Sequence, residues 1–257
     1  MIYKLKTILR KIKLVIREFL DLYSWYTYSP PTNFLKSNNN SNICIVVANG
    51  PSLKKTDLTN YREIYKIGMN RAYLSDRSDL NFSLFTITNE NVLKQFKSDF
   101  YQLKVPITTL FRHRSIINHK FKKDIIYVKT KLFGPINFPS NVLVGHTVTN
   151  LAIQVALFMG FKKILIVGMD HSFITPRTRK ENVTEIKKLD VDKDHFIPNY
   201  FPKGSKWDTP DLISSEKEYR ILKNFAEKNN AEIVDCTIDG KCHIFRKSTL
   251  ESEIIKK

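Results

Sequence analysis

The stretch ICIVVANGPS, residues 43–52, decides the fold of this chain. Its first six residues are uncharged and apolar, which is typical of a parallel strand that is buried on both faces. Asn49 and Gly50 then mark a tight turn, and Pro51 and Ser52 are residue types that are common at the start of a helix. A buried strand that runs through a turn into a helix is how doubly wound α/β folds begin.

This first turn is a candidate phosphate-binding site. Gly50 lets the backbone approach a ligand closely, and the Ser52 hydroxyl together with the free amides of a helix start can bind an anion. The residues match neither GxGxxG nor GxxxxGK[ST], which excludes the dinucleotide and P-loop motifs. A purely structural turn is the alternative interpretation.

Two further apolar runs, residues 64–69 and 82–87, predict strands that are also followed by asparagine. Asparagine donates and accepts hydrogen bonds, so it suits the edge of a base or a ribose, although a single asparagine is also a common turn former. Open α/β sheets bind ligands at the carboxyl ends of their strands. We therefore expect four strand-end residues to contact a nucleotide: Asn49, Asn70, Arg71 and Asn89.

Residues 145–171 predict a helix that crosses over to a parallel strand. An apolar helix is expected over 150–159 and a strand over 163–167, which leads to Asp170 and His171 at its carboxyl end. We expect ligand contacts from both of these residues. Unpaired amides and the helix dipole favour phosphate at the helix start, which holds Gly145, His146 and Thr147.

The rest of the pattern completes an α/β protein with a Rossmann-like, mostly parallel sheet and helices on both faces. The nucleotide-binding catalytic domain is expected to span residues 43–257. Its other expected elements are strands at 107–111, 125–128 and 232–236, a helix at 216–229, an extended segment at 242–245 and a solvated basic face at 112–123.

A lid-like insertion is expected at about 173–208. Residues 175–194 are highly charged, and the loop that follows is rich in aromatic residues, prolines and groups capable of catalysis. Histidine is the residue type suited to general-base catalysis near neutral pH, and His195 can act as the base if Asp194 or another carboxylate orients it. Candidates for contact with substrate or leaving group are Tyr200, Lys203 and Trp207, and the alternative is a structural aromatic clasp.

Residues 1–28 predict a basic amphipathic helix, followed by a linker over 29–42. Six Lys and Arg residues face two acidic ones, and the apolar stripe has spacings of three and four: Ile2, Leu5, Leu9, Ile12, Ile16, Phe19, Tyr23 and Tyr26. Such a helix lies in the headgroup layer of an anionic bilayer. The alternative is a heptad seam that packs on the domain or on a second copy of the chain. In the second case the protein would form an oligomer.

Composition limits the partners and the compartment. The chain has 257 residues, and 42 Lys and Arg against 25 Asp and Glu give a net charge of +17, which favours negatively charged partners. Three cysteines suit a reducing compartment, and Cys236, Cys242 and His243 lack a four-ligand zinc pattern, so no metal is expected. With no run of about 18 uncharged apolar residues, we expect a cytoplasmic protein, peripheral on the inner face of the membrane.

The chain resembles two related bacterial families. The shared pattern is an apolar strand into NGPSL at 49–53, a second strand that ends at Asn70, a small-residue start to an Ala-rich helix, and GFKKI at 160–164 leading into VGMD at 167–170. One family is the lipooligosaccharide sialyltransferases, metal-independent enzymes that use CMP-sialic acid. The other is the MptE-like (6-hydroxymethylpterin diphosphokinase-like) family of surface-polysaccharide loci, which the segment 195–204 resembles more.

The sialyltransferase resemblance implies roles for particular residues. It implies that Asn49, Gly50, Pro51 and Ser52 form part of the nucleotide site, that Gly145, His146 and Thr147 contact the donor, and that His195 deprotonates the acceptor hydroxyl. That family has tyrosines after its third motif, where this chain has His171, Ser172 and Phe173. Tyr200, Lys203 or Trp207 are the candidates to replace them at the leaving phosphate.

Three classes of function follow from these observations. The preferred one is a metal-independent, inverting glycosyltransferase with His195 as base, which needs no cofactor and moves a sugar acid from a CMP-activated donor to a glycan or glycolipid acceptor. The alternative is a Mg²⁺-dependent diphosphokinase that transfers pyrophosphate from ATP to a small hydroxymethyl substrate, with Asp170 and Glu90 as the candidate ligands. Nucleic-acid binding is not favoured, because the positive charge is spread along the chain.

Overall fold

The computed structural model describes residues 23–29, 42–117, 125–130, 134–173, 184–186 and 192–254. The chain forms two compact units, Met1–Pro31 and Thr32–Lys257. In the first unit residues 23–26 are helical, while most of the helix predicted over 1–28 and most of the linker over 29–42 lie outside the described residues. Among the residues described, no helix combines the length and the apolar character that crossing a bilayer requires.

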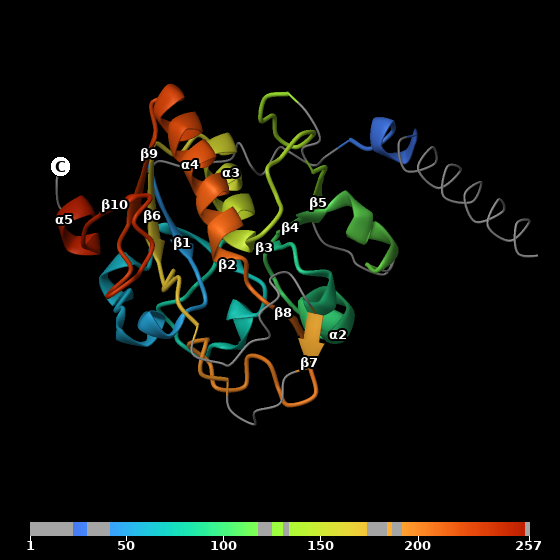
Figure 1. Cartoon of the computed structure of the whole chain (residues 1–257), viewed down its shortest axis with the longest axis horizontal. Helices are drawn as coiled ribbons and strands as arrows, with labels where there is room; N and C mark the ends of the chain where they lie inside the picture. The colour runs from blue at the N-terminus through green and yellow to red at the C-terminus, as the bar shows by residue number, and fades with distance from the viewer. Residues whose placement is uncertain are drawn as a thin grey trace, which may run out of the picture. The chain divides into compact units, whose positions relative to one another are not determined.

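The second unit is built on an eight-stranded sheet in which every neighbouring pair is parallel (Figure 1). The strand order is β10-β9-β6-β1-β2-β3-β4-β5. The bounds are β1 Ile43–Val47, β2 Tyr65–Met69, β3 Leu84–Ile87, β4 Ile107–Leu110, β5 Ile125–Val128, β6 Lys163–Val167, β9 Glu232–Asp235 and β10 Arg246–Lys247. The predicted Rossmann-like α/β fold is confirmed.

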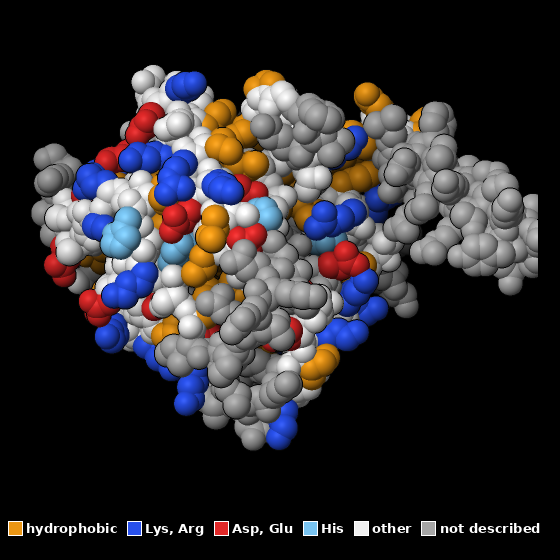
Figure 2. Space-filling view, in the orientation of Figure 1, with side chains coloured by type: hydrophobic (Ala, Val, Ile, Leu, Met, Phe, Trp, Pro, Cys, Tyr) orange, Lys and Arg blue, Asp and Glu red, His pale blue; other side chains and the backbone are white. Residues whose placement is uncertain are grey.

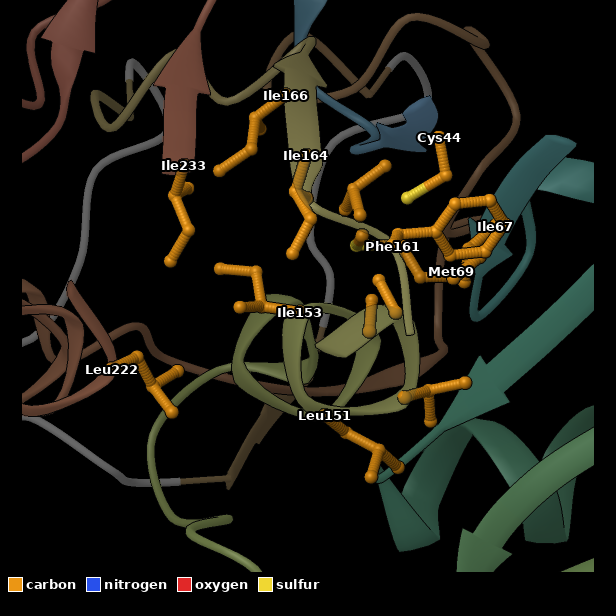
Figure 3. Packing of buried hydrophobic residues seen from close by; sticks show 14 of the residues in the cluster. Cys44, Ile67, Met69, Leu151, Ile153, Phe161, Ile164, Ile166, Leu222 and Ile233 are labelled. Carbon is orange, nitrogen blue, oxygen red and sulfur yellow. The ribbon is translucent and has the colours of Figure 1, made fainter. Parts of the chain in front are cut away.

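Helices cover both faces of this sheet. On one face Ile164 and Ile166 of β6 belong to an apolar cluster with Ile153 and Leu222, which lie on the helices α3 (Val148–Phe158) and α4 (Leu212–Lys228) (Figure 3). On the other face Leu165 of β6 clusters with side chains of the 3₁₀ helix η2 (Pro51–Lys55) and of α5 (Leu250–Ile254). Successive side chains of a strand point to opposite faces, so an uninterrupted apolar run is needed to fill both layers.

The strand order places a switch point at β1, which pairs with β2 on one side and with β6 on the other. The chain passes from β1 to strands on one side and returns through α3 to β6 on the other. Loops at the carboxyl ends of β1 and β6 therefore diverge, and this divergence leaves a crevice in which doubly wound folds bind their ligands.

Several local expectations differ from the structure. The helix start after β1 is the short η2 rather than an α-helix, and the extended segment expected at 242–245 is followed by β10 and α5. The helix α4 begins four residues before the expected position because Asp211 caps it by accepting a hydrogen bond from the amide of Ser214 at 2.9 Å. The helix α2 (Glu90–Phe100) was not expected, and Asn89 is its cap.

The segment expected to form a lid is described in part. Residues 184–186 form β7 (Thr184–Ile186), which pairs antiparallel with β8 (Lys206–Asp208), and residues 174–183 and 187–191 lie outside the described part of the chain. The following loop, 192–201, is anchored to the sheet, since the amide of Phe196 donates to the carbonyl of Asn49 at 2.9 Å. This hydrogen bond brings His195 to the end of β1.

The basic stretch 112–123 was expected to form a solvated face, and this is wrong at His113. The helix η5 (Phe111–Ser115) buries the His113 side chain completely, and Nδ1 lies 2.9 Å from Oγ1 of Thr109. Burial disfavours the charged imidazolium and lowers the pKa of His113 to about 4. The error arose because neighbouring arginines dominate the hydropathy of this stretch, whereas the 3₁₀ turn directs one side chain inward.

We expect this histidine to make the fold sensitive to acid. Between about pH 6.5 and pH 4 the unfolded chain binds a proton at His113 that the folded chain does not bind, so the free energy of unfolding falls as the pH falls, by up to about 1.4 kcal/mol per pH unit. His113→Gln removes this contribution. Urea unfolding at about pH 7 and pH 5 measures it, with the exposed His243 changed to Gln as the control. Equal pH dependence in all three proteins would contradict the assignment.

Candidate functional site

A pocket of about 400 Å³ opens at the carboxyl ends of the strands, at the switch point of the sheet. It brings together most of the residues singled out in the sequence, although they come from segments far apart along the chain. The lining includes Asn49, Gly50, Asn70, Asn89, Gly145, His146, Thr147, Asp170, His171, His195, Tyr200 and Trp207. Four of the predicted site residues do not line it: Pro51, Ser52, Arg71 and Lys203.

The turn after β1 holds a carboxylate of the protein itself. The amide and the hydroxyl of Ser52 both donate to Asp170, at 3.1 Å and 2.7 Å, and the amide of Gly50 donates to the carbonyl of Gly168 at 2.8 Å. A Cβ atom on Gly50 would lie 2.0 Å from Oδ2 of Asp170, so only glycine allows this close approach. The anion position expected for a phosphate at Ser52 is thus taken by Asp170, and Ser52 acts on the pocket only through that carboxylate.

The three strand-end asparagines have different roles. Asn49 donates from Nδ2 to the carbonyl of Met69 at 3.1 Å and to the hydroxyl of Tyr200 at 2.9 Å. Oδ1 of Asn49 and Oδ1 of Asn70 are buried and have no hydrogen-bond partner among the described residues. Asn89 instead uses its Oδ1 to accept from the amide of Val92 at 3.0 Å as the cap of α2. Two of the three therefore hold a buried acceptor without a hydrogen-bond donor in the wall of the pocket, and the third stabilises a helix.

His195 is held by a carboxylate, as a general base requires. The sequence offered Asp194 or another carboxylate, and the partner is Asp192. Nδ1 of His195 lies 2.9 Å from Oδ2 of Asp192, whose side chain is completely buried. Asp192 also accepts hydrogen bonds from the amides of Asp194 at 3.0 Å and Phe201 at 3.2 Å, which fix its own orientation. This pairing fixes the tautomer with the proton on Nδ1, so Nε2 is the nitrogen able to accept a proton.

Tyr200 ties this dyad to the sheet. Its ring stacks on that of His195 with the centroids 4.0 Å apart and the planes 2° apart, and its hydroxyl accepts from the amide of Arg71 at 3.1 Å. The guanidinium of Arg71 donates to the carbonyl of Tyr200 and lies over the ring of Phe96. Tyr200 and Arg71 were expected to touch substrate or nucleotide. In the structure Tyr200 lines the pocket, but its side chain is almost completely buried, with 1% exposed. Arg71 does not line the pocket and instead holds Tyr200 in place through these hydrogen bonds.

A second histidine in the pocket also has a carboxylate partner. Nε2 of His171 lies 3.1 Å from Oε1 of Glu216 on α4, and Oε2 of Glu216 accepts from Arg220 at 3.3 Å. His171 follows β6 with a φ of 55°, a backbone conformation that turns its side chain away from the path of the strand. His171 and His195 thus line one pocket from different elements of the fold, each held from outside the lining by a carboxylate, and His146 lines it beside Asp211 and Glu218.

The start of α3, expected to bind phosphate, also lies against a carboxylate. The amide of His146 donates to Oε2 of Glu218 at 3.4 Å, and a Cβ atom on Gly145 would lie 2.5 Å from Oε1. The side-chain amide of Asn150 also donates to Glu218. Oγ1 of Thr147 caps the helix by accepting from the backbone amide of Thr149 at 3.3 Å. Burial raises the pKa of Glu218, so this carboxylate gives up its charge more readily than an exposed one.

The two carboxylates expected to hold Mg²⁺ line the pocket, and each already has a protein partner. Asp170 is engaged by Ser52, and Glu90 forms an ion pair with Lys94 one helical turn along α2. In the part of the chain that the structure describes, no three His, Cys, Asp or Glu side chains are arranged to hold a metal ion. Magnesium needs at least one or two carboxylates free to bind it beside the substrate phosphates.

Sequence reasoning missed three of the residues that shape this site. Asp192 is one of three aspartates at 190–194, and nothing in the sequence tells which of them turns toward His195. Glu216 and Glu218 lie on α4, 45 residues from His171 and 72 residues from His146. The only available signal was their position in the first two turns of a predicted helix. Trp207 lines the pocket as expected, whereas Lys203 is exposed to solvent.

Fold and site together define a Rossmann-like protein with a polar pocket at the strand ends. The model of the MptE-like family, described as 6-hydroxymethylpterin diphosphokinase MptE-like, matches residues 18–176. The chain therefore belongs to the MptE-like family, whose description names an enzyme that transfers a group, and the match includes both β1 and the turn at Asp170. No curated protein and no solved structure matches the chain.

We expect Asp170→Asn to lower the free energy of unfolding by about 1–2 kcal/mol, because Ser52 then donates to a neutral oxygen instead of a charged one. Urea unfolding measures the change. The matched control is Asp208→Asn on the rim of the pocket, where the carboxylate accepts from Asn91 at 2.9 Å and from Thr184 at 2.6 Å in a more exposed setting. The control should cost less than about 0.5 kcal/mol. Equal losses in the two variants would show that Asp170 does not hold the turn.

Proposed function

We propose that this protein is a metal-independent transferase that moves a sugar acid from a CMP-activated donor to a hydroxyl group of a glycan or lipid-linked acceptor. The observation that carries the proposal is that His195 and His171 line one pocket at the switch point of the sheet, where Asp192 orients the first and Glu216 the second. A displacement at a sugar carbon needs a base for the incoming hydroxyl and a charge to stabilise the leaving phosphate. Two separately oriented histidines supply both.

The chemical step follows from these positions. Nε2 of His195 accepts the proton of the acceptor hydroxyl, and the hydroxyl oxygen forms a bond to the anomeric carbon. The bond from that carbon to the phosphate oxygen breaks, so CMP leaves with the electron pair and the anomeric configuration inverts. His171, whose Nε2 lies against Glu216, donates a hydrogen bond from its other ring nitrogen to the leaving phosphate. Asp192 stabilises the imidazolium that forms on His195.

The buried acceptors at the ends of β1 and β2 support a base that carries an amino group. Oδ1 of Asn49 and Oδ1 of Asn70 need N–H or O–H donors, and cytosine and adenine each carry an exocyclic amine with two N–H groups. Uracil has no such amine. The side-chain amide of Asn49 is oriented by its bonds to Met69 and Tyr200, which leaves its oxygen without a protein donor, and a small side-chain movement would bring that oxygen to the ligand.

The second candidate is the diphosphokinase that the family description names. It shares the amino-bearing base, since ATP carries adenine, and differs in its need for Mg²⁺. The engaged carboxylates at Asp170 and Glu90 favour the transferase. In either case we propose that the reaction takes place at the inner face of the membrane, with residues 1–28 on its anionic surface.

A nucleotide screen distinguishes the two candidates. We expect CMP without metal, at about 100 times its Kd, to raise the Tm by roughly 5–10 °C, because binding to the folded state alone contributes about 2.7 kcal/mol at that concentration. Differential scanning fluorimetry with CMP, UDP, GDP and ATP, each with and without Mg²⁺, measures the shift. Stabilisation by ATP only in the presence of Mg²⁺ would replace the transferase with the diphosphokinase, and no response to any nucleotide would reject both.

Changing the base tests the mechanism. We expect His195→Ala and Asp192→Asn each to lower the rate of CMP release from the donor by about 10²–10⁴-fold, because the asparagine still contacts the ring but no longer fixes its tautomer or stabilises its charge. Nucleotide affinity should change less than about twofold in both variants. The exposed His243, outside the pocket, gives the control His243→Ala. Near-normal turnover by His195→Ala would end its assignment as the base.

A further inference from the structure

The outer face of α4 carries exposed isoleucines beside cations. Ile213 is 62% exposed and Ile221 is 45% exposed, although a soluble helix normally buries its isoleucines. Lys217 and Arg220 lie between them on the same face, at the three- and four-residue spacings that join one side of a helix. Figure 2 shows orange and blue side chains next to one another over this helix. We call this set of four residues the α4 outer face.

A groove with apolar side chains at its base and polar groups at its opening continues this face at the carboxyl-terminal half of the helix. It has a volume of about 280 Å³ and lies between α4, α3 and the segment around Phe138, with Asn137, Gln154, Lys162 and Asn229 as its polar residues. The rings of Phe138 and Phe158 stack in it with their centroids 4.4 Å apart. Most of the side chains that line the groove are apolar: Ile136, Phe138, Leu157, Phe158, Phe161 and Phe225. Exposed isoleucines and an apolar groove thus lie along a single helix.

The charges around this surface are mainly positive. Five cations lie on α4 or at the groove, and two of the nearby acids remain on the accessible side, Glu216 and Glu227. Glu216 is already paired with Arg220 and His171. The cations are Lys162, Lys217, Arg220, Lys223 and Lys228. Apolar side chains flanked by cations are complementary to an anionic lipid surface, where the apolar groups enter the headgroup layer and the cations contact phosphates.

The opposite side of the same helix lines the main pocket. Leu212, Ser215 and Tyr219 belong to its wall, one to four residues from the exposed isoleucines. The helix α4 therefore separates the pocket from the α4 outer face, and the two are one helix diameter apart.

We propose that the α4 outer face and the adjoining apolar groove form a membrane-contact surface for an anionic bilayer. This surface is separate from the helix predicted over residues 1–28. This proposal rests on the composition and exposure of α4 and does not depend on the chemistry of the pocket. A negative nucleotide screen would therefore leave it intact, and a negative lipid experiment would leave the proposed function intact.

A fluorophore placed on α4 tests contact directly. The native cysteines Cys44, Cys236 and Cys242 are all buried, and burial raises their pKa values, so a cysteine introduced at the surface reacts selectively. The full-length Ile213→Cys and Ile221→Cys variants are labelled with bimane, whose emission shifts to the blue in an apolar setting. Ile186→Cys in β7 is the matched control, because Ile186 is 49% exposed and lies outside α4.

We expect a blue shift at positions 213 and 221 on adding vesicles of phosphatidylglycerol and phosphatidylethanolamine, a smaller one with phosphatidylcholine, and none at position 186. Two outcomes would overturn the proposal: vesicle binding without a shift on α4, and no vesicle binding by the full chain. A shift at position 213 that grows with protein concentration in the absence of lipid would also overturn it, in favour of a second copy of the chain on this face.

An unlabelled variant gives a second measurement. Ile213→Asn combined with Ile221→Asn should weaken sedimentation with the phosphatidylglycerol vesicles by roughly tenfold or more, since each isoleucine loses most of its apolar transfer free energy. The exposed positions keep the effect on folding small, and circular dichroism checks it. Ile186→Asn should leave sedimentation unchanged. Unchanged sedimentation of the double variant would show that other residues carry all lipid binding.

Discussion

The carboxylate of Asp170 joins the ends of β1 and β6, and the geometry of the pocket depends on it. Its oxygens accept from the amide and the hydroxyl of Ser52, 118 residues earlier in the chain, at the point where the loops on either side of the sheet diverge. The contact requires glycine at position 50, where a side chain would collide with the carboxylate. Asn49 on one side and His171 on the other take their positions from this junction.

A carboxylate of the protein also accepts from a backbone amide at the start of α3, the second helix start that faces the pocket. Glu218 accepts from the amide of His146 as Asp170 accepts from Ser52, so internal carboxylates meet the exposed amides that would otherwise attract anions without discrimination. The raised pKa of Glu218 makes this second contact the more easily changed of the two. A donor phosphate that enters the pocket thus meets oriented histidines and asparagines rather than bare helix ends, which favours ligands with matching hydrogen-bond groups.

The loop that carries the proposed base is organised differently. His195 receives its orientation from Asp192, its stacking surface from Tyr200 and its position from the bond between Phe196 and Asn49. Arg71 supports Tyr200 from the end of β2. The loop is therefore held against the carboxyl ends of the strands. The helix α4 lines the pocket on one side and exposes isoleucines on the other.

The sequence by itself determined the core strands of the parallel sheet, the helices α3 and α4 and the set of asparagines at the strand ends, because apolar runs and turn residues are local signals. It did not reveal the helix α2. It identified His195 and His171, but it could not tell which carboxylate orients the first and named none for the second. Only the tertiary structure decided that Asp192 orients His195, that Asp170 occupies the first anion position, and that His113 is buried. These are contacts of side chains whose direction depends on packing between segments up to 118 residues apart, and no periodicity in the chain encodes them.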